Sequence, residues 1–413
     1  MISNIDYRNL ILYLVLASSI LVGYYFGEDS SGSGGFINDF YNTWPIVENI
    51  KSNFFSDFSP YTIHFPLHYY ILYFVEIFVQ NKESTRLFFC IFSLFIPFIF
   101  FLVLKDKFKE INPDKLFLFS QILFILPSFR SGAIWANSQI TSIIFLIISI
   151  LFFVKWENKN IKNFTIDIFF QILFLSLAVY SRQLYALLFV YILFIYFKKL
   201  SFTEFFKTII FSGIFALPGL FLVVFFPDTL STTFDFKFQN SLLVNLSIIS
   251  FYILPFLIVS DYKKFIPFLY NKKNYIILFL FLVVTTCLVF YFSYNPYLGG
   301  GFFIKLSLII FDNLYFFYLT SLLGMIVVYF SFLEERNSLI LFSLLILGFS
   351  SYQIFQKYFE PMLIILIFTI VLTNYSKMIL KSYKKILIFK SYFFLYLASA
   401  IINDFFQITK NLS

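Results

Sequence analysis

The chain has 413 residues and a formal net charge of +8; 60% of its residues are hydrophobic, 24% are aromatic and 13% are charged. A soluble globular fold cannot hide this much apolar surface from water. Apolar runs long enough to cross about 30 Å of hydrocarbon as helices recur from end to end, and none alternates like a barrel strand. We therefore expect an all-α, polytopic membrane protein, with a single integral-membrane domain over residues 1–413.

Taken in chain order, the apolar runs predict about 13 transmembrane helices. They are 9–26, 87–104, 115–128, 138–154, 164–180, 184–197, 207–226, 242–259, 275–293, 313–332, 338–350, 360–373 and 389–405. The first run follows Arg8 and lacks a small-residue cleavage site, so we expect it to be retained as a helix. Segment 65–80 is apolar but short, contains Pro66 and Glu76, and is expected to lie in the interface as a juxtamembrane helix.

The basic residues predict the topology. With 65–80 in the interface, 21 of the 30 Lys and Arg residues share one side with Arg8, which is the asymmetry of a cytoplasmic face. The net charge of +8 then reflects topology, and nucleic-acid binding is not expected. We expect a bacterial inner (plasma) membrane protein whose active site faces the periplasm or exterior.

The remaining polar stretches fall on the outer side, and the largest of them is the extracytoplasmic first loop, 27–86. The others are 129–137, 181–183, 227–241, 294–312 and 351–360. The cytoplasmic loops reach about 15 residues at most, which is too short for a folded domain. Motifs of the types GxxxxGK[ST], GxGxxG and DxD do not occur, so a cytosolic nucleotide or nucleotide-sugar site is excluded.

Asp39 is the candidate catalytic carboxylate. It follows the stretch "SSGSGG", whose glycines would let a flexible loop deliver the carboxylate into a cavity near the membrane. The alternative is a solvated acidic loop, and it applies more strongly to the other acidic residues there: Glu28, Asp29, Glu48 and Asp57.

Outer basic residues are candidates for binding a donor phosphate. Arg182, Lys357 and Arg130 are the candidates that we assign to this role, with Arg86 and Lys305 as further basic residues on that side. Arginine offers a phosphate two parallel hydrogen bonds, and lysine offers a point charge. The alternative for a cation at a helix end is that it simply extends to the lipid headgroups.

His64 and His68 are the only histidines and are spaced four apart in "HFPLH". Two histidines at this spacing can share a metal on a helix, but Pro66 lies between them and no third ligand is evident. We therefore expect both to contact substrate, and we assign no metal site. No cofactor is assigned, although a divalent cation stays open.

One carboxylate and one cation form a minimal set for glycosyl transfer from a polyprenyl-phosphate sugar. The carboxylate takes the proton of the attacking hydroxyl, and the cation stabilises the leaving phosphate. The acceptor would be a lipid-linked glycan, a cell-envelope polysaccharide or a protein. Because the sugar arrives already activated on a lipid, no nucleotide site is needed.

These features resemble the GT-C superfamily of integral-membrane glycosyltransferases, whose first extracytoplasmic loop carries a catalytic acidic residue and continues into juxtamembrane helices. Locally the chain is similar to the dolichyl-phosphate-glucose-dependent α-1,2-glucosyltransferase family. In that family an acidic residue is followed by W-D-P and then by P-P-G-x-Y. Here Asp39 is followed by "DFSP", ending at Pro60, and by "FPLHYY", which contains Pro66 and Tyr69.

The family's R-Q-T-N motif resembles "RQLY", which starts at Arg182, and "QKYFEP" resembles a segment of bacterial GT-C members. The resemblance implies substrate contacts for Tyr69, Gln183 and Glu360. It also implies a core helical module over 87–230 and variable helices over 231–413. Asp39 lacks the family's paired acidic neighbour, and Leu184 and Tyr185 replace its Thr-Asn.

Other functions remain open. A transporter or flippase of lipid-linked saccharides would be expected to show interrupted helices, midplane charges and internal repeats. A polysaccharide polymerase or ligase would be expected to carry a long late outer loop, whereas the longest outer loop here is the first. A noncatalytic membrane subunit is a further alternative.

Overall fold

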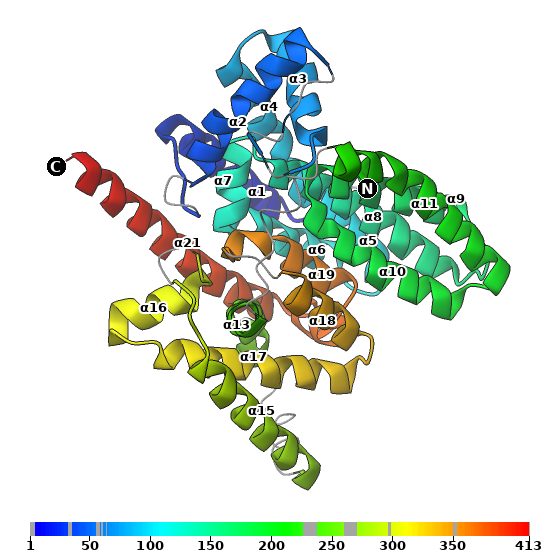
Figure 1. The fold of residues 1–413 in the computed structure, drawn as a ribbon, viewed down its shortest axis with the longest axis vertical. Coiled ribbons are helices and arrows are strands. Elements are labelled where there is room, and N and C mark those ends of the chain that lie inside the picture. Colours follow the sequence, from blue (N-terminus) through cyan, green and yellow to red (C-terminus); the bar gives the residue numbers. More distant parts are fainter. Residues whose placement is uncertain are drawn as a thin grey trace. The chain divides into compact units, whose positions relative to one another are not determined.

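The computed structural model describes residues 5–31, 35–54, 58, 61–62, 64–225, 238–259, 271–295, 299–349 and 353–412. Within these ranges the regular structure is entirely helical, without a β-strand (Figure 1). The predicted all-α class is therefore confirmed.

The chain divides into two compact units. One comprises Met1–Thr232 together with Lys390–Ser413, and the other comprises Thr233–Phe389. Residues from Lys390 onward thus belong to the same unit as the N-terminal part of the chain. The expected core module over 87–230 and variable helices over 231–413 stay predictions.

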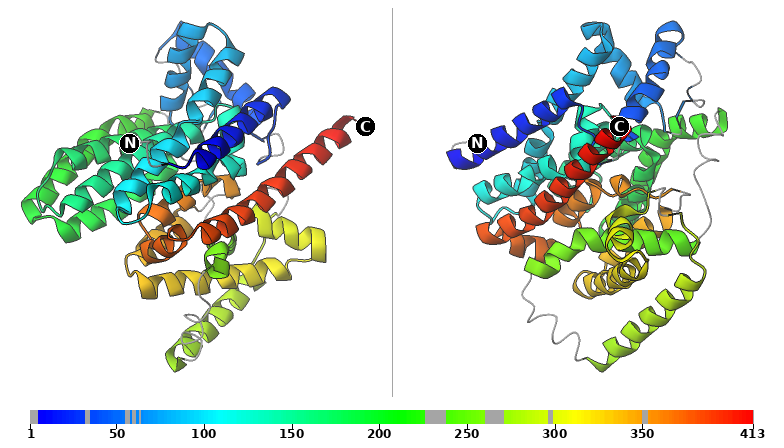
Figure 2. Two further views of the ribbon diagram at one scale, coloured as in Figure 1. Left: turned by 180° about the vertical axis from the view of Figure 1, so that it is seen from behind. Right: turned by 90° about the vertical axis from the view of Figure 1, so that its left-hand side faces the viewer.

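The first unit contains most of the helices. They are α1 (Tyr7–Phe26), α2 (Gly35–Ser52), α3 (Leu67–Val79), α4 (Lys82–Ser93), α5 (Ile96–Lys107), α6 (Pro113–Ser120), η1 (Gln121–Ile125), α7 (Pro127–Ile134), α8 (Ser138–Lys159), α9 (Ile166–Ser181), η2 (Gln183–Tyr185), α10 (Ala186–Lys199), α11 (Phe202–Phe225) and the later part of α21 (Tyr383–Leu412). Helices α2, α3 and α4 pack together and appear in blue tones in both views of Figure 2.

Helix α8 forms the centre of this unit, because α5 and α9 both pack along it and α10 lies beside α9 (Figure 1). Most of its apolar residues are buried, and the ring of half-buried Phe152 stacks on that of Phe174 of α9, with the ring centres 5.9 Å apart. Near its middle, the Ser149 hydroxyl donates to the Gln171 carbonyl oxygen at 3.0 Å. A polar group buried among apolar helices is thus satisfied by a neighbouring helix.

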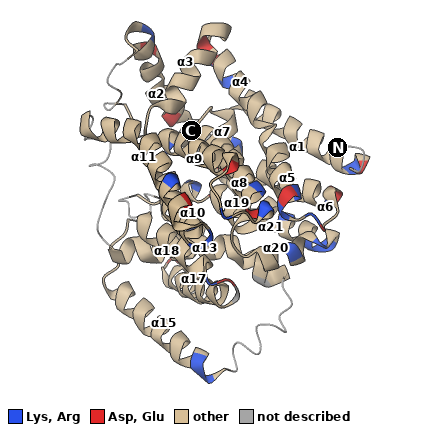
Figure 3. Ribbon diagram, turned by 90° about the vertical axis from the view of Figure 1, so that its right-hand side faces the viewer, with Lys and Arg blue, Asp and Glu red and all other residues tan. Residues whose placement is uncertain are grey.

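The two ends of α8 differ in charge. At its C-terminal end, Lys107 of α5 and Lys199 of α10 both pair with Glu157 at 2.8 Å, and Lys159 pairs with Asp167 at 2.5 Å. At its N-terminal end, Asn137 caps the helix. Because 22 residues rise about 33 Å, these ends lie on opposite sides of a membrane-sized span. Figure 3 shows charged residues mainly at helix ends and turns.

The second unit contains α13 (Phe238–Val259), α15 (Lys272–Phe290), α16 (Gly301–Phe311), α17 (Tyr315–Glu334), α18 (Ser338–Gly348), η4 (Gln356–Tyr358), α19 (Met362–Thr369), α20 (Thr373–Leu380) and the start of α21. Its core is the close contact of α13 with α17. A Cβ atom on Gly324 would lie 2.2 Å from the Leu246 carbonyl oxygen, so only glycine lets the two backbones approach this closely. The Ser321 hydroxyl donates to the Leu243 carbonyl oxygen across the same contact.

Eight helices in the described residues are long and apolar enough to cross a membrane, or up to ten if each of two bent pairs counts as one span. They are Tyr7–Phe26, Lys82–Lys107, Ser138–Lys159, Phe202–Phe225, Phe238–Phe256, Lys272–Phe290, Tyr315–Leu333 and Tyr383–Asp404; the bent pairs are Pro113–Ile125 with Pro127–Ile134, and Met362–Thr369 with Thr373–Leu380. This supports a multi-pass membrane protein.

The expected number of about 13 spans is not confirmed. Segments 164–180, 184–197 and 338–350 form helices of 16, 14 and 11 residues. Such helices extend about 24, 21 and 17 Å, which is less than the roughly 30 Å of hydrocarbon. Segment 65–80 also gives a short helix, α3, of 13 residues; its location in the membrane interface stays a prediction.

Candidate functional site

Asp39 lies on a helix and not in a flexible loop, which corrects the expectation for this residue. Helix α2 begins at Gly35, and its first backbone N–H groups, from Phe36 and Ile37, donate to the Asp29 carboxylate at 2.7 and 3.2 Å. Asp29 is 1% exposed, so the alternative of a solvated acidic residue is wrong for it. A buried capping carboxylate fixes the start of α2 and with it the position of Asp39.

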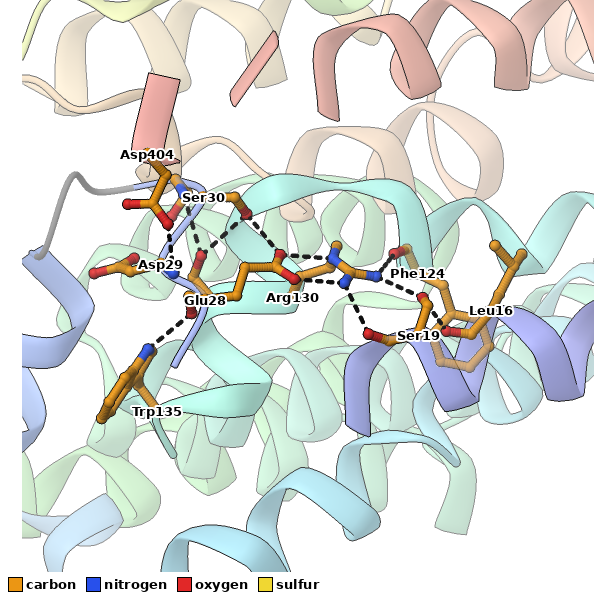
Figure 4. A network of polar contacts seen from close by, with 11 residues as sticks. Leu16, Ser19, Glu28, Asp29, Ser30, Phe124, Arg130, Trp135 and Asp404 are labelled. Atoms are coloured by element: carbon orange, nitrogen blue, oxygen red, sulfur yellow. Dashed lines mark hydrogen bonds and ion pairs between the residues drawn. The ribbon is translucent and has the colours of Figure 1, made fainter. Parts of the chain in front are cut away.

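Arg130 belongs to a buried structural network that also fixes the connection from α1 to α2 (Figure 4). Its guanidinium donates to both oxygens of Glu28, at 2.8 and 2.6 Å, and to the hydroxyl and carbonyl oxygens of Ser19. The side chains of Arg130 and Glu28 are only 5% and 12% exposed. The Trp135 indole N–H donates to the Glu28 carbonyl oxygen at 2.9 Å.

This network changes two expectations. Arg130 was expected to bind a donor phosphate. Its guanidinium is paired with the buried Glu28 carboxylate, so it is not assigned to phosphate binding. The stretch 129–137, expected as an outer polar loop, is largely helix α7, which is buried along its whole length.

Asp39 and Arg182 are joined through one side chain that the sequence did not single out. The Asn137 Nδ2 atom donates to Asp39 Oδ2 at 3.4 Å, and the Arg182 Nη2 atom donates to Asn137 Oδ1 at 3.2 Å. Asp39 comes from α2, Asn137 from the start of α8 and Arg182 from the end of α9. A carboxylate and a guanidinium that are 143 residues apart in the sequence thus share a single neutral bridge.

Arg182 is a buried cation with neutral partners. It is 3% exposed, and besides Asn137 it donates from Nε to the Ser138 hydroxyl at 3.1 Å. Among the described residues, no carboxylate lies at ion-pair distance from it. It also lies beside the N-terminus of α8, where the helix dipole is positive. Burying an uncompensated charge is unfavourable, so this position favours an anionic ligand such as a phosphate.

His64, Tyr69 and Gln183 lie beside this bridge. The His64 Nδ1 atom is 3.4 Å from the Gln183 side-chain oxygen, and the Tyr69 hydroxyl donates to the Thr62 hydroxyl at 3.1 Å. Burial raises the pKa of Tyr69, with nearby Asp39 raising it further and nearby Arg182 opposing the rise. The structure therefore brings these residues close to Asp39 and Arg182, and their contacts with substrate stay a prediction.

His68 is buried in the same region. It is 2% exposed, and its Nδ1 atom is 2.8 Å from the Thr141 hydroxyl of α8. Burial, with a smaller contribution from nearby Arg182, lowers the pKa of His68 to about 3, although a backbone hydrogen bond at Ala136 opposes this shift. The imidazole is therefore neutral at physiological pH, and a neutral imidazole can orient neighbouring groups through hydrogen bonds. In the described residues, no group of three His, Cys, Asp or Glu side chains could hold a metal ion.

Lys357 and Glu360 belong to the second unit. The Lys357 ammonium lies 5.3 Å from the centre of the Phe355 ring. Glu360 is fully buried and accepts a hydrogen bond from the Tyr252 hydroxyl at 2.6 Å. These two residues therefore belong to a different unit from Asp39.

Sequence reasoning missed Asn137 and Ser138. A signal was present, because Asn directly before the apolar run 138–154 is the usual N-terminal cap of a helix. Its second contact, with Arg182, depends on the packing of α9 against α8 and is not encoded locally.

A search of family models, of curated proteins and of solved structures finds no match to this chain.

Proposed function

We propose that this protein is an integral-membrane glycosyltransferase that moves a sugar from a polyprenyl-phosphate donor to an acceptor hydroxyl. The observation that carries the proposal is the Asp39–Asn137–Arg182 bridge, which holds a carboxylate near a buried guanidinium that pairs with no carboxylate of the described residues. The sequence resemblance to the GT-C superfamily through Asp39 and Arg182 supports the same function.

In the proposed reaction the acceptor oxygen attacks the anomeric carbon of the donor sugar. Its proton passes to the Asp39 carboxylate as the new glycosidic bond forms. The bond between the anomeric carbon and the phosphate oxygen breaks, and the electron pair leaves with the polyprenyl phosphate. Arg182 stabilises the negative charge that develops there, and a phosphate that leaves as an anion needs no separate acid.

The geometry suits these roles. Two hydrogen bonds of 3.4 and 3.2 Å separate Asp39 from Arg182, joined by one carboxamide about 2.2 Å across. The carboxylate oxygen and the guanidinium nitrogen are thus at most about 9 Å apart, which is close enough for one sugar ring and its phosphate to contact both groups.

The proposed site also lies at the end of α8 opposite to its lysine-rich end. If the lysine-rich end is cytoplasmic, as the distribution of basic residues predicts, the reaction takes place on the periplasmic or exterior side. We propose that His64, Gln183 and Tyr69 contact the acceptor, a lipid-linked or envelope glycan. Lys357 and Glu360 have no assigned role in the proposed reaction.

The test is transfer from radiolabelled polyprenyl-phosphate sugars to lipid-linked glycans by the protein reconstituted in liposomes. We expect Asp39→Asn to lower kcat by about 10²–10⁴-fold, as for loss of a general base. Arg182→Gln should weaken both donor binding and kcat. Asp312→Asn and Arg336→Gln make the same changes at exposed positions of the second unit and should transfer normally. Transfer by Asp39→Asn at the wild-type rate would refute the proposal.

A transporter of lipid-linked saccharides is the second candidate. The two bent helix pairs favour it, because interrupted helices are typical of transporter binding sites. The helices bend by 68° between Pro113–Ile125 and Pro127–Ile134, and by 92° between Met362–Thr369 and Thr373–Leu380. In the same liposomes, movement of labelled lipid-linked sugar between leaflets without formation of a new glycoside would favour transport.

A further inference from the structure

The side chain of Asn137 is held in one orientation. Its Oδ1 atom accepts from the Gln139 backbone N–H at 3.0 Å and from Arg182 Nη2 at 3.2 Å. Both partners are donors, so the oxygen must face them, and the Nδ2 atom must face Asp39. The amide therefore cannot flip without losing two hydrogen bonds.

The backbone around Asn137 is also fixed. The preceding residue, Ala136, has a φ of 43°, in the left-handed region that residues with a Cβ atom rarely adopt. The Asn137 backbone N–H donates to the Gly132 carbonyl oxygen at 2.9 Å, which ties the turn back to α7. Asn137 is only 7% exposed. An unfavourable backbone conformation that is held by packing and hydrogen bonds is common at functional sites.

We infer that Asn137 is a positioning residue for the proposed transfer reaction, and this inference rests on the proposed function. It acts as a neutral spacer that orients both Asp39 and Arg182 and keeps them from pairing with each other. A carboxylate paired directly with a guanidinium becomes a weaker base, and the guanidinium loses its capacity for an anionic ligand. One uncharged amide between them preserves both functions.

The test substitution is Asn137→Asp. Aspartate has nearly the same size and is an equally good helix cap, so the start of α8 is preserved. It would, however, place a carboxylate against Arg182 and repel Asp39. Among the described residues, other titratable groups near Asp39 or Arg182 are His64, His68, Tyr69 and Tyr185. The buried His68 is neutral at neutral pH, and a tyrosine carries no positive charge, so His68 and the two tyrosines do not compensate for a new carboxylate.

We expect Asn137→Asp to lower kcat/KM at least about 100-fold and to move the acid limb of the rate–pH profile at least one unit higher, because two adjacent carboxylates share a proton more readily. Binding of a ten-carbon isoprenyl phosphate, measured by its effect on the melting temperature, should weaken at least tenfold. Asn271→Asp, which makes the same change at the cap of α15, should alter neither measurement.

Asn137→Ser is the second variant, because serine also caps a helix but is too short to reach Asp39. We expect kcat to fall at least tenfold with little change in KM. If both variants transfer like wild type with an unchanged pH profile while Asp39→Asn is inactive, the inference fails and the proposed function stands. If Asp39→Asn is fully active, the proposed function fails. In that case, isoprenyl phosphate binding to Asn137→Asp still tests whether Asn137 keeps Arg182 available for an anionic ligand. Binding as tight as that of the wild type would refute this part of the inference.

Discussion

The buried pair of Arg130 and Glu28 makes a quantitative prediction about the stability of the first unit. The substitution Glu28→Gln keeps the size of the side chain but leaves the Arg130 guanidinium without its carboxylate. Breaking a buried pair by changing one partner costs about 3–5 kcal/mol. We expect the lower end, about 3 kcal/mol, because the Ser19 oxygens still accept two hydrogen bonds from Arg130. For a unit of this size, that lowers the melting temperature by about 6–12 °C.

The assay is thermal unfolding of the purified protein in detergent, followed by tryptophan fluorescence. Glu83→Gln is the matched control: its carboxylate pairs with Arg86 at 2.9 Å but is 47% exposed, so its loss should cost at most about 1 kcal/mol. Equal melting temperatures for Glu28→Gln and Glu83→Gln would refute the structural role of the pair. Weakened donor binding by Glu28→Gln at an unchanged melting temperature would instead restore Arg130 as a phosphate-binding residue.

Two further predictions concern pH and helix packing. Burial lowers the pKa of His68 to about 3 from the ordinary 6.5, so below pH 6.5 the unfolded chain binds a proton that the folded one does not. Stability should therefore fall from pH 6.5 toward pH 3, and His68→Gln should reduce the difference in melting temperature between pH 7.5 and pH 5; an unchanged difference would contradict this. Gly324→Ala places a Cβ atom 2.2 Å from the Leu246 carbonyl oxygen and should lower stability by about 1–3 kcal/mol. Gly213→Ala, with open space around the new Cβ atom, should be neutral or stabilising, and equal melting temperatures for these two variants would argue against the close contact of α13 with α17.

The local pattern of the sequence was sufficient to predict where helices form but not how long they are. The apolar runs are largely helical because hydrophobic composition and period are local properties, although runs 115–128 and 360–373 are interrupted by breaks between helices. The runs 164–180, 184–197 and 338–350 were expected to span the membrane and gave helices of 16, 14 and 11 residues. Where an apolar helix ends depends on turns and packing partners, which a hydropathy pattern does not contain.

The polar loop 27–86, by contrast, contains a helix that its amino-acid pattern did not predict. The stretch leading to Asp39 was expected to be flexible, but Asp39 lies on α2, which begins at Gly35. Segment 65–80 was expected to be a helix and contains α3. The capping of α2 by Asp29 and the pairing of Glu28 with Arg130 hold its beginning in place. A mixed polar sequence has little helical signal of its own, and tertiary contacts stabilise most of such a helix.

The sequence by itself determined the all-α class and the suitability of the chain for a membrane, because these follow from composition and hydropathy. It nominated Asp39, His64, Tyr69, Gln183 and Arg182 one by one. Only the tertiary structure decided that these residues lie together, that Asn137 bridges Asp39 and Arg182, and that Arg130 is committed to Glu28. The reason is physical: a hydrogen bond between side chains a hundred residues apart depends on how helices pack, and no local pattern encodes that distance.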